Sequence, residues 1–260
     1  MTAQFSQNDP FRRDAAYDLI ETCRPTEAVT TAGVRRCASI LDQKISPPSL
    51  PKLVARPRIT RLLEHSRRQF PATLILGRAG TGKTALAADF ASAQPHVFWY
   101  SVEATDSDWT IFSRYFSACL CGGEKSLMEG DALGDSLTPT HIARFLVEHF
   151  PLCDSGALLI LDDLHHIFEA AWFDDLFQLL IYSLPPSTHA LMLSRSEPPT
   201  PTWRLRSKQL LNVVDERAIS FDPSETKALF QSRGITPTDI QRVHTDTFGR
   251  ISRLLEYVAG

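Results

Sequence analysis

One eight-residue segment has the residue types and the spacing that phosphate binding requires. Gly77-Arg-Ala-Gly-Thr-Gly-Lys83-Thr84 matches the pattern G-x-x-x-x-G-K-[ST], between an apolar run and a helical pattern. In such a loop glycines let backbone N–H groups face a phosphate, the lysine bridges the β- and γ-phosphates, and the threonine ligates Mg²⁺. A Gly-rich turn without a ligand is the alternative, and the flanking elements argue against it. We expect phosphate contacts from Gly77, Ala79, Gly80, Thr81, Gly82, Lys83, Thr84 and Ala85.

Two carboxylates follow an apolar run later in the chain. Leu158–Leu161 is followed by Asp162 and Asp163, which is the form of the acidic strand that partners a phosphate-binding loop. We expect Asp162 to hold Mg²⁺ together with Thr84, and Asp163 to polarise the attacking water. A solvated strand end or a helix cap is the alternative for such a pair, and the presence of the loop favours the functional interpretation.

A third polar strand end carries an arginine. Leu191-Met192-Leu193 is followed by Ser194 and Arg195, which a parallel sheet would place at its ligand-binding edge. We expect Arg195 to sense the γ-phosphate, because a guanidinium suits phosphate geometry, although a surface arginine with an ion partner is the alternative. The guanine-specificity pattern Asn/Thr-Lys-x-Asp does not occur in the sequence, which disfavours guanine.

Apolar runs and helical patterns alternate from residue 72 onward. This alternation predicts an α/β fold with a five-stranded, mostly parallel sheet covered by helices on both faces. We predict domains at 1–47 (an N-terminal extension), 48–220 (the core) and 221–260 (a helical lid). The predicted strands are 72–76, 97–101, 157–161, 190–194 and 209–213; the predicted helices are 14–23, 58–68, 83–93, 108–120, 140–150, 172–184 and 222–230, with a long loop at 122–134.

Composition sets limits on the class of protein. The 260 residues are 43% hydrophobic and carry a formal charge of −3, which predicts a globular protein without a general attraction to nucleic acid. Five cysteines lack the spacing of a disulfide framework or a zinc site. The N-terminus is polar and the longest apolar runs are well below the ~18 residues of a membrane helix. We expect a cytoplasmic protein that does not enter the membrane.

The order of these segments resembles the nucleotide-binding domain of the STAND class of signal-transduction ATPases, in particular LuxR-type bacterial regulators like the maltose activator. Beyond the two nucleotide motifs, the resemblance rests on five segments that span residues 51 to 225. These are Pro51–Leu63 with Arg56-Pro57, Phe98–Glu103 with Asp106, Phe112 with Tyr115, Arg204–Leu211, and Phe221–Glu225.

The resemblance implies a P-loop NTPase of ASCE/RecA-like topology with a small helical lid. It implies ATP rather than GTP, with Val54 to Ile59, Arg56 among them, near the adenine. We therefore expect ATP or ADP with Mg²⁺ as ligands, and catalytic roles for Lys83, Asp163 and Arg195. The expected function is a slowly hydrolysing switch module of a transcription regulator that lacks, in this chain, the sensor and DNA-binding domains of its relatives. Relatives have small or apolar residues after the lid glycine, whereas this chain has Gly249-Arg-Ile-Ser252.

Two further hypotheses stay open. The chain could be a non-hydrolysing, nucleotide-gated module that binds another protein or itself. It could also be a DNA-associated ATPase, which only Arg204, Arg206 and Lys208 favour. Direct DNA binding is the weaker hypothesis, because such charge runs are usually solvated and no helix-turn-helix is recognisable.

Overall fold

The sheet has five strands, and all of its pairings are parallel. The computed structural model describes residues 43–50, 54–120, 138–142, 144, 156–235 and 239–259. Within these residues the strand order is β2-β3-β4-β1-β5. The α/β fold is therefore confirmed, and the sheet is wholly rather than mostly parallel. The strands are β1 (Ala72–Leu76), β2 (Val97–Ser101), β3 (Ala157–Asp162), β4 (Thr188–Ser194) and β5 (Leu211–Val214).

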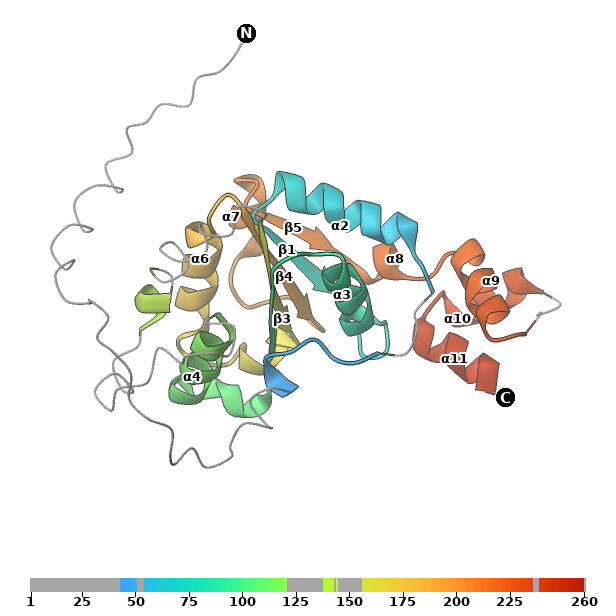
Figure 1. Ribbon diagram of the computed structural model, residues 1–260, viewed down its shortest axis with the longest axis horizontal. Coiled ribbons are helices and arrows are strands. Elements are labelled where there is room, and N and C mark those ends of the chain that lie inside the picture. Colours follow the sequence, from blue (N-terminus) through green and yellow to red (C-terminus); the bar gives the residue numbers. More distant parts are fainter. Residues whose placement is uncertain are drawn as a thin grey trace, which may run out of the picture. The chain divides into compact units, whose positions relative to one another are not determined.

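Helices connect and cover these strands (Figure 1). Short 3₁₀ turns, η2 (Ala104–Ser107) and η4 (Leu164–Ile167), follow β2 and β3. The helices are α2 (Pro57–Gln69), α3 (Lys83–Ser92), α4 (Trp109–Leu120), α6 (Phe173–Ser183), α7 (Thr202–Ser207), α8 (Glu216–Ile219), α9 (Pro223–Ser232), α10 (Ile240–Thr247) and α11 (Ile251–Ala259).

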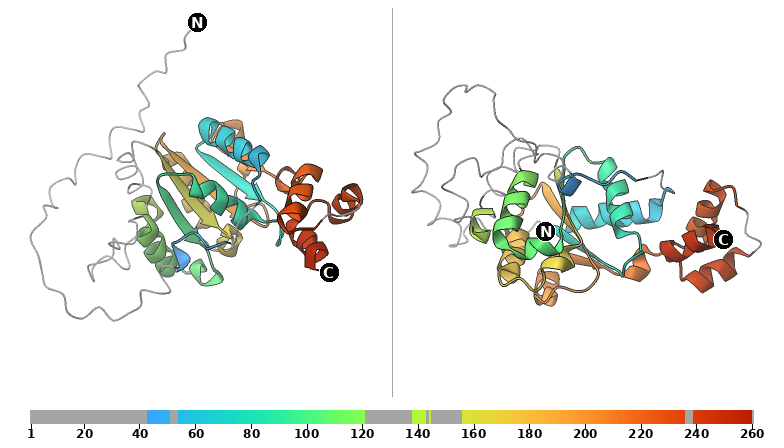
Figure 2. Two further views of the ribbon diagram at one scale, coloured as in Figure 1. Left: turned by 45° about the vertical axis from the view of Figure 1, so that its right-hand side comes forward. Right: turned by 90° about the horizontal axis from the view of Figure 1, so that it is seen from below.

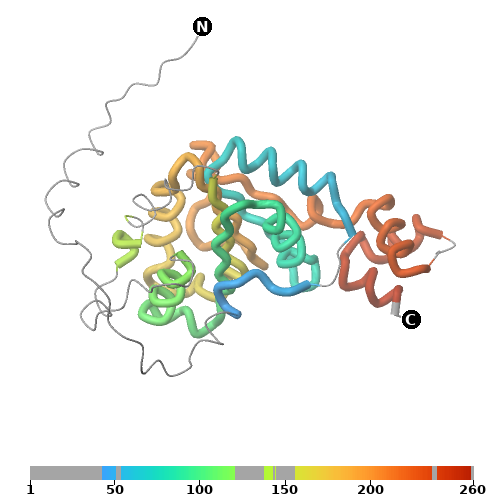
Figure 3. Tube along the Cα trace, viewed as in Figure 1, coloured from blue at the N-terminus to red at the C-terminus, as the bar shows by residue number. Residues whose placement is uncertain are grey.

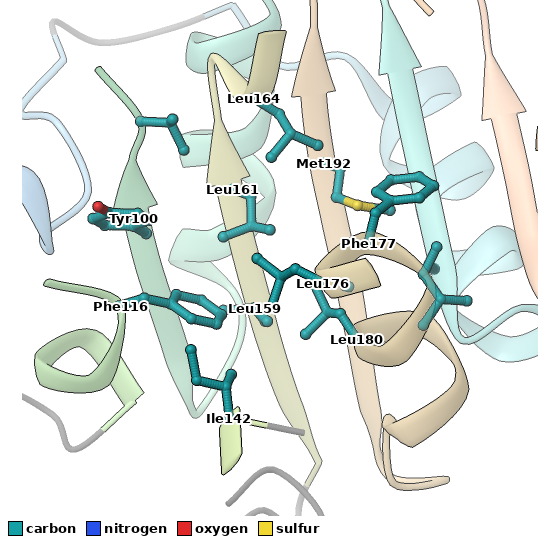
Figure 4. Packing of buried hydrophobic residues seen from close by; sticks show 14 of the residues in the cluster. Tyr100, Phe116, Ile142, Leu159, Leu161, Leu164, Leu176, Phe177, Leu180 and Met192 are labelled. Carbon is teal, nitrogen blue, oxygen red and sulfur yellow. The ribbon is translucent and has the colours of Figure 1, made fainter. Parts of the chain in front are cut away.

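Two hydrophobic clusters lie on opposite faces of the sheet. On one face Ile75, Ile160 and Leu193 pack with α2 and α3. On the other face α4 and α6 contribute to the cluster, and Figure 4 shows Leu161 and Met192 of the sheet near α6. Strands β3 and β4 are buried along their whole length, as expected of strands covered on both faces. This double cover explains why these segments read as continuous apolar runs.

The segment 43–50 is held to the core by a buried lysine. Lys44 Nζ lies 2.7 Å from Asp106 Oδ1 and 3.2 Å from Glu103 Oε2, and its side chain is 5% exposed. Its ammonium also lies 4.6 Å from the centre of the Tyr115 ring. These contacts attach segment 43–50 to the region after β2, which is one of the two edge strands of the sheet.

Three helices at the C-terminal end, α9, α10 and α11, follow the core (Figure 3). Helix α9 begins with a capping box, in which Asp222 accepts a hydrogen bond from the Glu225 N–H and Glu225 accepts one from the Asp222 N–H. The predicted helix start at Asp222-Pro223 is thus confirmed. Phe221, Leu229, Phe230 and Leu254 form a hydrophobic cluster of their own, against which Val54 packs. We call α9–α11 the lid.

The predicted fifth strand begins too early. Gln209 has φ +57°, a left-handed conformation that cannot belong to an extended strand, and the strand begins at Leu211. The predicted helix 140–150 lies largely outside the described residues. The predicted helix 14–23 and the loop 122–134 lie wholly outside them.

Across the part of the chain that the structure describes, no helix combines the length and the apolar character needed to cross a membrane.

One glycine of the lid lies directly against the backbone at Phe221, just before α9. Gly249 has φ +65°, its carbonyl accepts a hydrogen bond from the Phe221 N–H at 2.9 Å, and a Cβ added to it would lie 2.1 Å from the Phe221 carbonyl oxygen. Gly234, in the same lid, has φ +71° and nothing within 4 Å of an added Cβ. The two positions share the same backbone conformation and differ only in crowding.

We expect Gly249→Ala to lower the free energy of unfolding by about 2–5 kcal/mol, because it combines left-handed strain with a steric clash. The control Gly234→Ala should cost only the strain, about 1–2 kcal/mol. Urea unfolding of both variants measures the difference. Equal costs would mean that the close approach of Gly249 and Phe221 does not exist.

Candidate functional site

The loop between β1 and α3 is tightly curled. Gly80 and Gly82 have φ of +75° and +87°, and a Cβ on Gly77 would lie 2.9 Å from Thr81 Oγ1. Only glycine adopts the first two conformations without strain, and only glycine fits at the third position. Geometry therefore accounts for both glycines of the sequence pattern, Gly77 and Gly82, and for Gly80 between them. We call Gly77–Thr84 the P-loop.

Several backbone donors of the P-loop have no partner within the described residues. The N–H groups of Gly80, Gly82, Lys83 and Thr84 lack an acceptor there, whereas Thr81 N–H reaches the Arg78 carbonyl at 3.4 Å. The last two begin α3, where the helix dipole adds positive potential. An oxyanion satisfies such a set of donors.

Lys83 lies at the base of the P-loop. Its ammonium donates hydrogen bonds to the carbonyls of Gly77 at 2.6 Å and Arg78 at 3.2 Å. Burial lowers the pKa of Lys83, while the nearby Asp163 and Asp162 oppose this shift. An anionic oxygen is a stronger acceptor for an ammonium than a neutral carbonyl, so the residue suits phosphate.

Asp162 ends β3 beside the P-loop. Asp162 is 4% exposed, and the Thr84 hydroxyl lies near its carboxylate. Burial raises the pKa of Asp162 to about 6, and the nearby Thr84 hydroxyl opposes this shift. A carboxylate that burial makes costly to ionise gains from a divalent cation, and the paired hydroxyl and carboxylate oxygens suit Mg²⁺.

Asp163 and Arg195 lie together at the same edge of the sheet. Asp163 has φ +53°, and its N–H donates to Asp162 Oδ1 at 2.9 Å. Arg195 Nε lies 3.9 Å from Asp163 Oδ1, and His165 Nδ1 lies 3.8 Å from the same oxygen. Both members of the Arg195 pair are partly exposed, so the pair contributes little to stability.

A mainly apolar cavity of about 290 Å³ lies beside the P-loop and α3. Its walls include Val54, Gly82 and Leu86 from the core and Phe221 and Ile251 from the lid region. A cavity of this kind fits a flat heterocycle, since small-molecule sites are concave and mostly apolar.

Arg56 lines that cavity, and its guanidinium is engaged elsewhere. It donates to the carbonyls of Ile219 at 2.8 Å and Ser220 at 3.0 Å, and to Glu225 Oε2 at 2.9 Å. Its charged group also stacks 4.0 Å from the centre of the Phe221 ring. The charge of Arg56 therefore fastens the lid to the core.

The first turn of α11 packs directly on the P-loop. Ser252 N–H donates to the Gly80 carbonyl at 3.1 Å, and Arg250 donates to the Ala79 carbonyl. Ile251 Cγ2 would lie 3.0 Å from a Cβ on Gly82. The residues that differ from the expected lid pattern, Arg250–Ser252, are thus the ones that contact the loop.

The structure brings the expected site residues together at one edge of the sheet. The P-loop follows β1, Asp162 and Asp163 follow β3, and Arg195 follows β4. Sequence reasoning missed His165, for which the Asp-Asp-x-His spacing was the available signal. It also missed Glu225 and Glu216, the partners of Arg56 and Arg78, because these contacts join residues more than 130 positions apart.

No protein-family model matches the chain. The chain is 26% identical over 199 residues to the HTH-type transcriptional regulator MalT of Vibrio parahaemolyticus, covering 72% of this chain and 21% of the relative. It is 26% identical over 209 residues to MalT of Serratia proteamaculans, covering 78% and 23%. The chain is a homologue of MalT regulators. The resemblance inferred from the sequence is confirmed, and the chain spans about a fifth of the length of these MalT relatives.

Solved structures agree on the fold. A STAND protein with a tetratricopeptide repeat sensor from Pyrococcus horikoshii is similar with a TM-score of 0.51 and 19% identity, over 83% of this chain and 31% of that one. A Walker-type ATPase of Pyrococcus abyssi has a TM-score of 0.51 and 14% identity, over 79% and 71%. The P-loop ATPase fold of the MalT-like chain is thus established.

Proposed function

We propose that this chain is the ATP-binding switch module of a MalT-like, cytoplasmic regulator. The observation that carries the proposal is the curled P-loop. Its N–H groups without a partner in the described part of the chain lie beside Lys83, Thr84 and Asp162. Similarity to transcription regulators and to a STAND protein supports a regulatory role.

Phosphate binding falls to the P-loop. Backbone donors from Gly80 to Thr84 would hold the β-phosphate, and the Lys83 ammonium would exchange its carbonyl acceptors for phosphate oxygens. Thr84 and Asp162 would hold Mg²⁺, which supplies neutralisation of phosphate charge when bound. Each of these groups contributes through position and charge, with no covalent step by the protein.

The apolar cavity beside the P-loop is the proposed adenine site. Its core-side walls, Val54, Gly82 and Leu86, and its lid-side walls, Phe221 and Ile251, would enclose the ring from two sides. A bound ring would then stabilise the contact between lid and core. Arg56 takes a positioning role in this proposal, because its guanidinium holds Phe221 and Glu225.

Hydrolysis is the slower part of the proposed activity. Asp163 would orient the attacking water and accept its proton, and Arg195 would stabilise charge on the transferred phosphoryl group. The 3.9 Å separation of Arg195 Nε and Asp163 Oδ1 supports a joint role of the two groups. The change from ATP to ADP would alter the contacts that hold Arg250–Ser252 on the loop.

A second candidate is a module that binds ATP without hydrolysing it and then binds a protein partner or a second copy. The observation that favours it is the position of the Arg195 guanidinium, whose Nε lies 3.9 Å from the Asp163 carboxylate. A carboxylate held this way is a weaker base. We do not propose DNA binding by the chain, since Lys208 contacts Tyr182 and only two further basic side chains of that cluster remain.

The affinity for ATP tests the role of Lys83. Lys83→Ala should weaken ATP binding at least about tenfold, because it removes a buried charge that faces the phosphates. The control Lys227→Ala removes an exposed lysine of the lid and should leave affinity unchanged. Isothermal titration calorimetry with ATP and Mg²⁺ measures both. Equal affinity of Lys83→Ala and the wild-type chain would refute the assignment of the loop.

Replacement of Asp163 distinguishes the hydrolysing switch from the non-hydrolysing module. Asp163→Asn keeps a residue that tolerates the left-handed backbone and removes the proton acceptor. Phosphate release should fall by about 10²-fold or more while ATP affinity stays within about threefold of the wild-type value. A coupled phosphate assay measures release. A wild-type chain that binds ATP and releases no phosphate would instead support the non-hydrolysing module.

A further inference from the structure

A second cavity, of about 410 Å³, lies on the outer side of the P-loop. The core contributes Arg78 from the loop and residues of α8, and the lid contributes the turn between α10 and α11. It is half polar, unlike the apolar cavity beside α3. The lining residues that matter here are Arg78, Glu216, Arg217, Phe248, Arg250 and Arg253.

The cavity carries a strong excess of positive charge. Four arginines and one glutamate line it, which leaves a formal charge of +3. Glu216 is committed to Arg78, with 3.2 Å between Oε2 and Nε. The exposed side chains of Arg217 and Arg253 have no ion-pair or hydrogen-bond partner within the described residues. The chain as a whole is acidic, at −3, so this excess is local.

Arg250 adds an unsatisfied buried donor. One of its terminal N–H groups donates to the Ala79 carbonyl, and its Nε is buried without a hydrogen-bond partner. A buried N–H that lacks an acceptor is unfavourable. An anionic oxygen in the cavity would satisfy it.

Phe248 presents an apolar wall at the mouth of the cavity. Phe248 is 73% exposed, which is unusual for a large apolar residue among the described residues. Its backbone has φ +54°, a left-handed conformation that is uncommon for an aromatic residue. Strain and exposure at one residue are features that structures retain at ligand sites.

We propose that this cavity binds a small ligand carrying two or more phosphate-type negative charges. Its volume exceeds that of a single oxyanion, and its arginines offer the paired donors that phosphate groups accept. The cavity is separate from the apolar cavity proposed for the adenine, although Arg78 belongs to the P-loop.

Such a ligand would connect the core to the lid. Arg78 and Arg217 belong to the core, whereas Arg250 and Arg253 flank the start of α11. A ligand that contacts both pairs strengthens the contact of α11 with the P-loop. An anion bound in the cavity would thus stabilise the contact between lid and P-loop in addition to any effect of ATP.

Inorganic pyrophosphate is a suitable probe, and the chain offers matched controls. All titrations use the Lys83→Ala chain, so that pyrophosphate binding by the P-loop is weakened. The test variant adds Arg217→Gln with Arg253→Gln. The control adds Arg204→Gln with Arg206→Gln, two exposed arginines of α7 outside the cavity, so that net charge changes equally. Calorimetry at constant ionic strength, adjusted with chloride, measures affinity and stoichiometry.

We expect one pyrophosphate per Lys83→Ala chain, a loss of at least about tenfold in affinity in the test variant, and no change in the control. Absence of binding to the Lys83→Ala chain would overturn the proposal, and so would equal affinity of the test and control variants. The result is independent of ATP affinity, so failure here and failure of the proposed ATPase function are distinguishable. Circular dichroism verifies that each variant is folded.

Discussion

The common direction of the five strands is the constraint on which the site depends. Because β1, β3 and β4 are parallel, their carboxyl ends meet at one edge of the sheet. The P-loop, the two aspartates and Arg195 then lie together although they are up to 118 positions apart, from Gly77 to Arg195. A parallel sheet must be covered on both faces, which the two helical layers and their hydrophobic clusters achieve (Figure 2).

The lid depends on the core through a few close contacts. Gly249 allows the chain to pass against the Phe221 carbonyl, and the following residues then reach the P-loop backbone. Arg56, just before α2 of the core, forms a salt bridge with Glu225 of α9 in the lid. The salt bridge is largely buried, so loss of Glu225 would leave the Arg56 charge without a carboxylate, whereas Glu225 also pairs with Arg58 at 3.0 Å. The P-loop and the lid are therefore parts of one packed unit.

Much of this arrangement could be predicted from local sequence. The P-loop pattern, the acidic end of β3 and the start of α9 are short-range signals, and the structure has the expected elements at those residues. The predicted fifth strand began two residues before β5. Gln209 has a left-handed conformation just after the end of α7, and an apolar pattern does not reveal such a turn.

Contacts of the lid could not be predicted in this way. Arg250 and Ser252 meet Ala79 and Gly80 only through the tertiary path of the chain, and no spacing rule relates residues so distant in sequence. The role of Arg56 illustrates the same limit. The resemblance indicated that Arg56 lies near the adenine, and Arg56 does line the cavity proposed for the adenine. Local sequence could not show that Glu225 and two carbonyls hold its charged group. The sequence shows that Arg250–Ser252 differ from the family pattern. Only the structure shows that these residues contact the P-loop backbone.

The central claim is that ATP binds where the lid meets the P-loop, and hydrogen exchange tests it most directly. Exchange of the wild-type chain, followed by mass spectrometry with and without ATP and Mg²⁺, should slow at least about tenfold, or about 1.4 kcal/mol, at both 80–85 and 251–254. Helix α4, on the opposite face of the sheet from α3, should be unaffected. Protection of the loop without the lid, or of neither segment, would contradict the account.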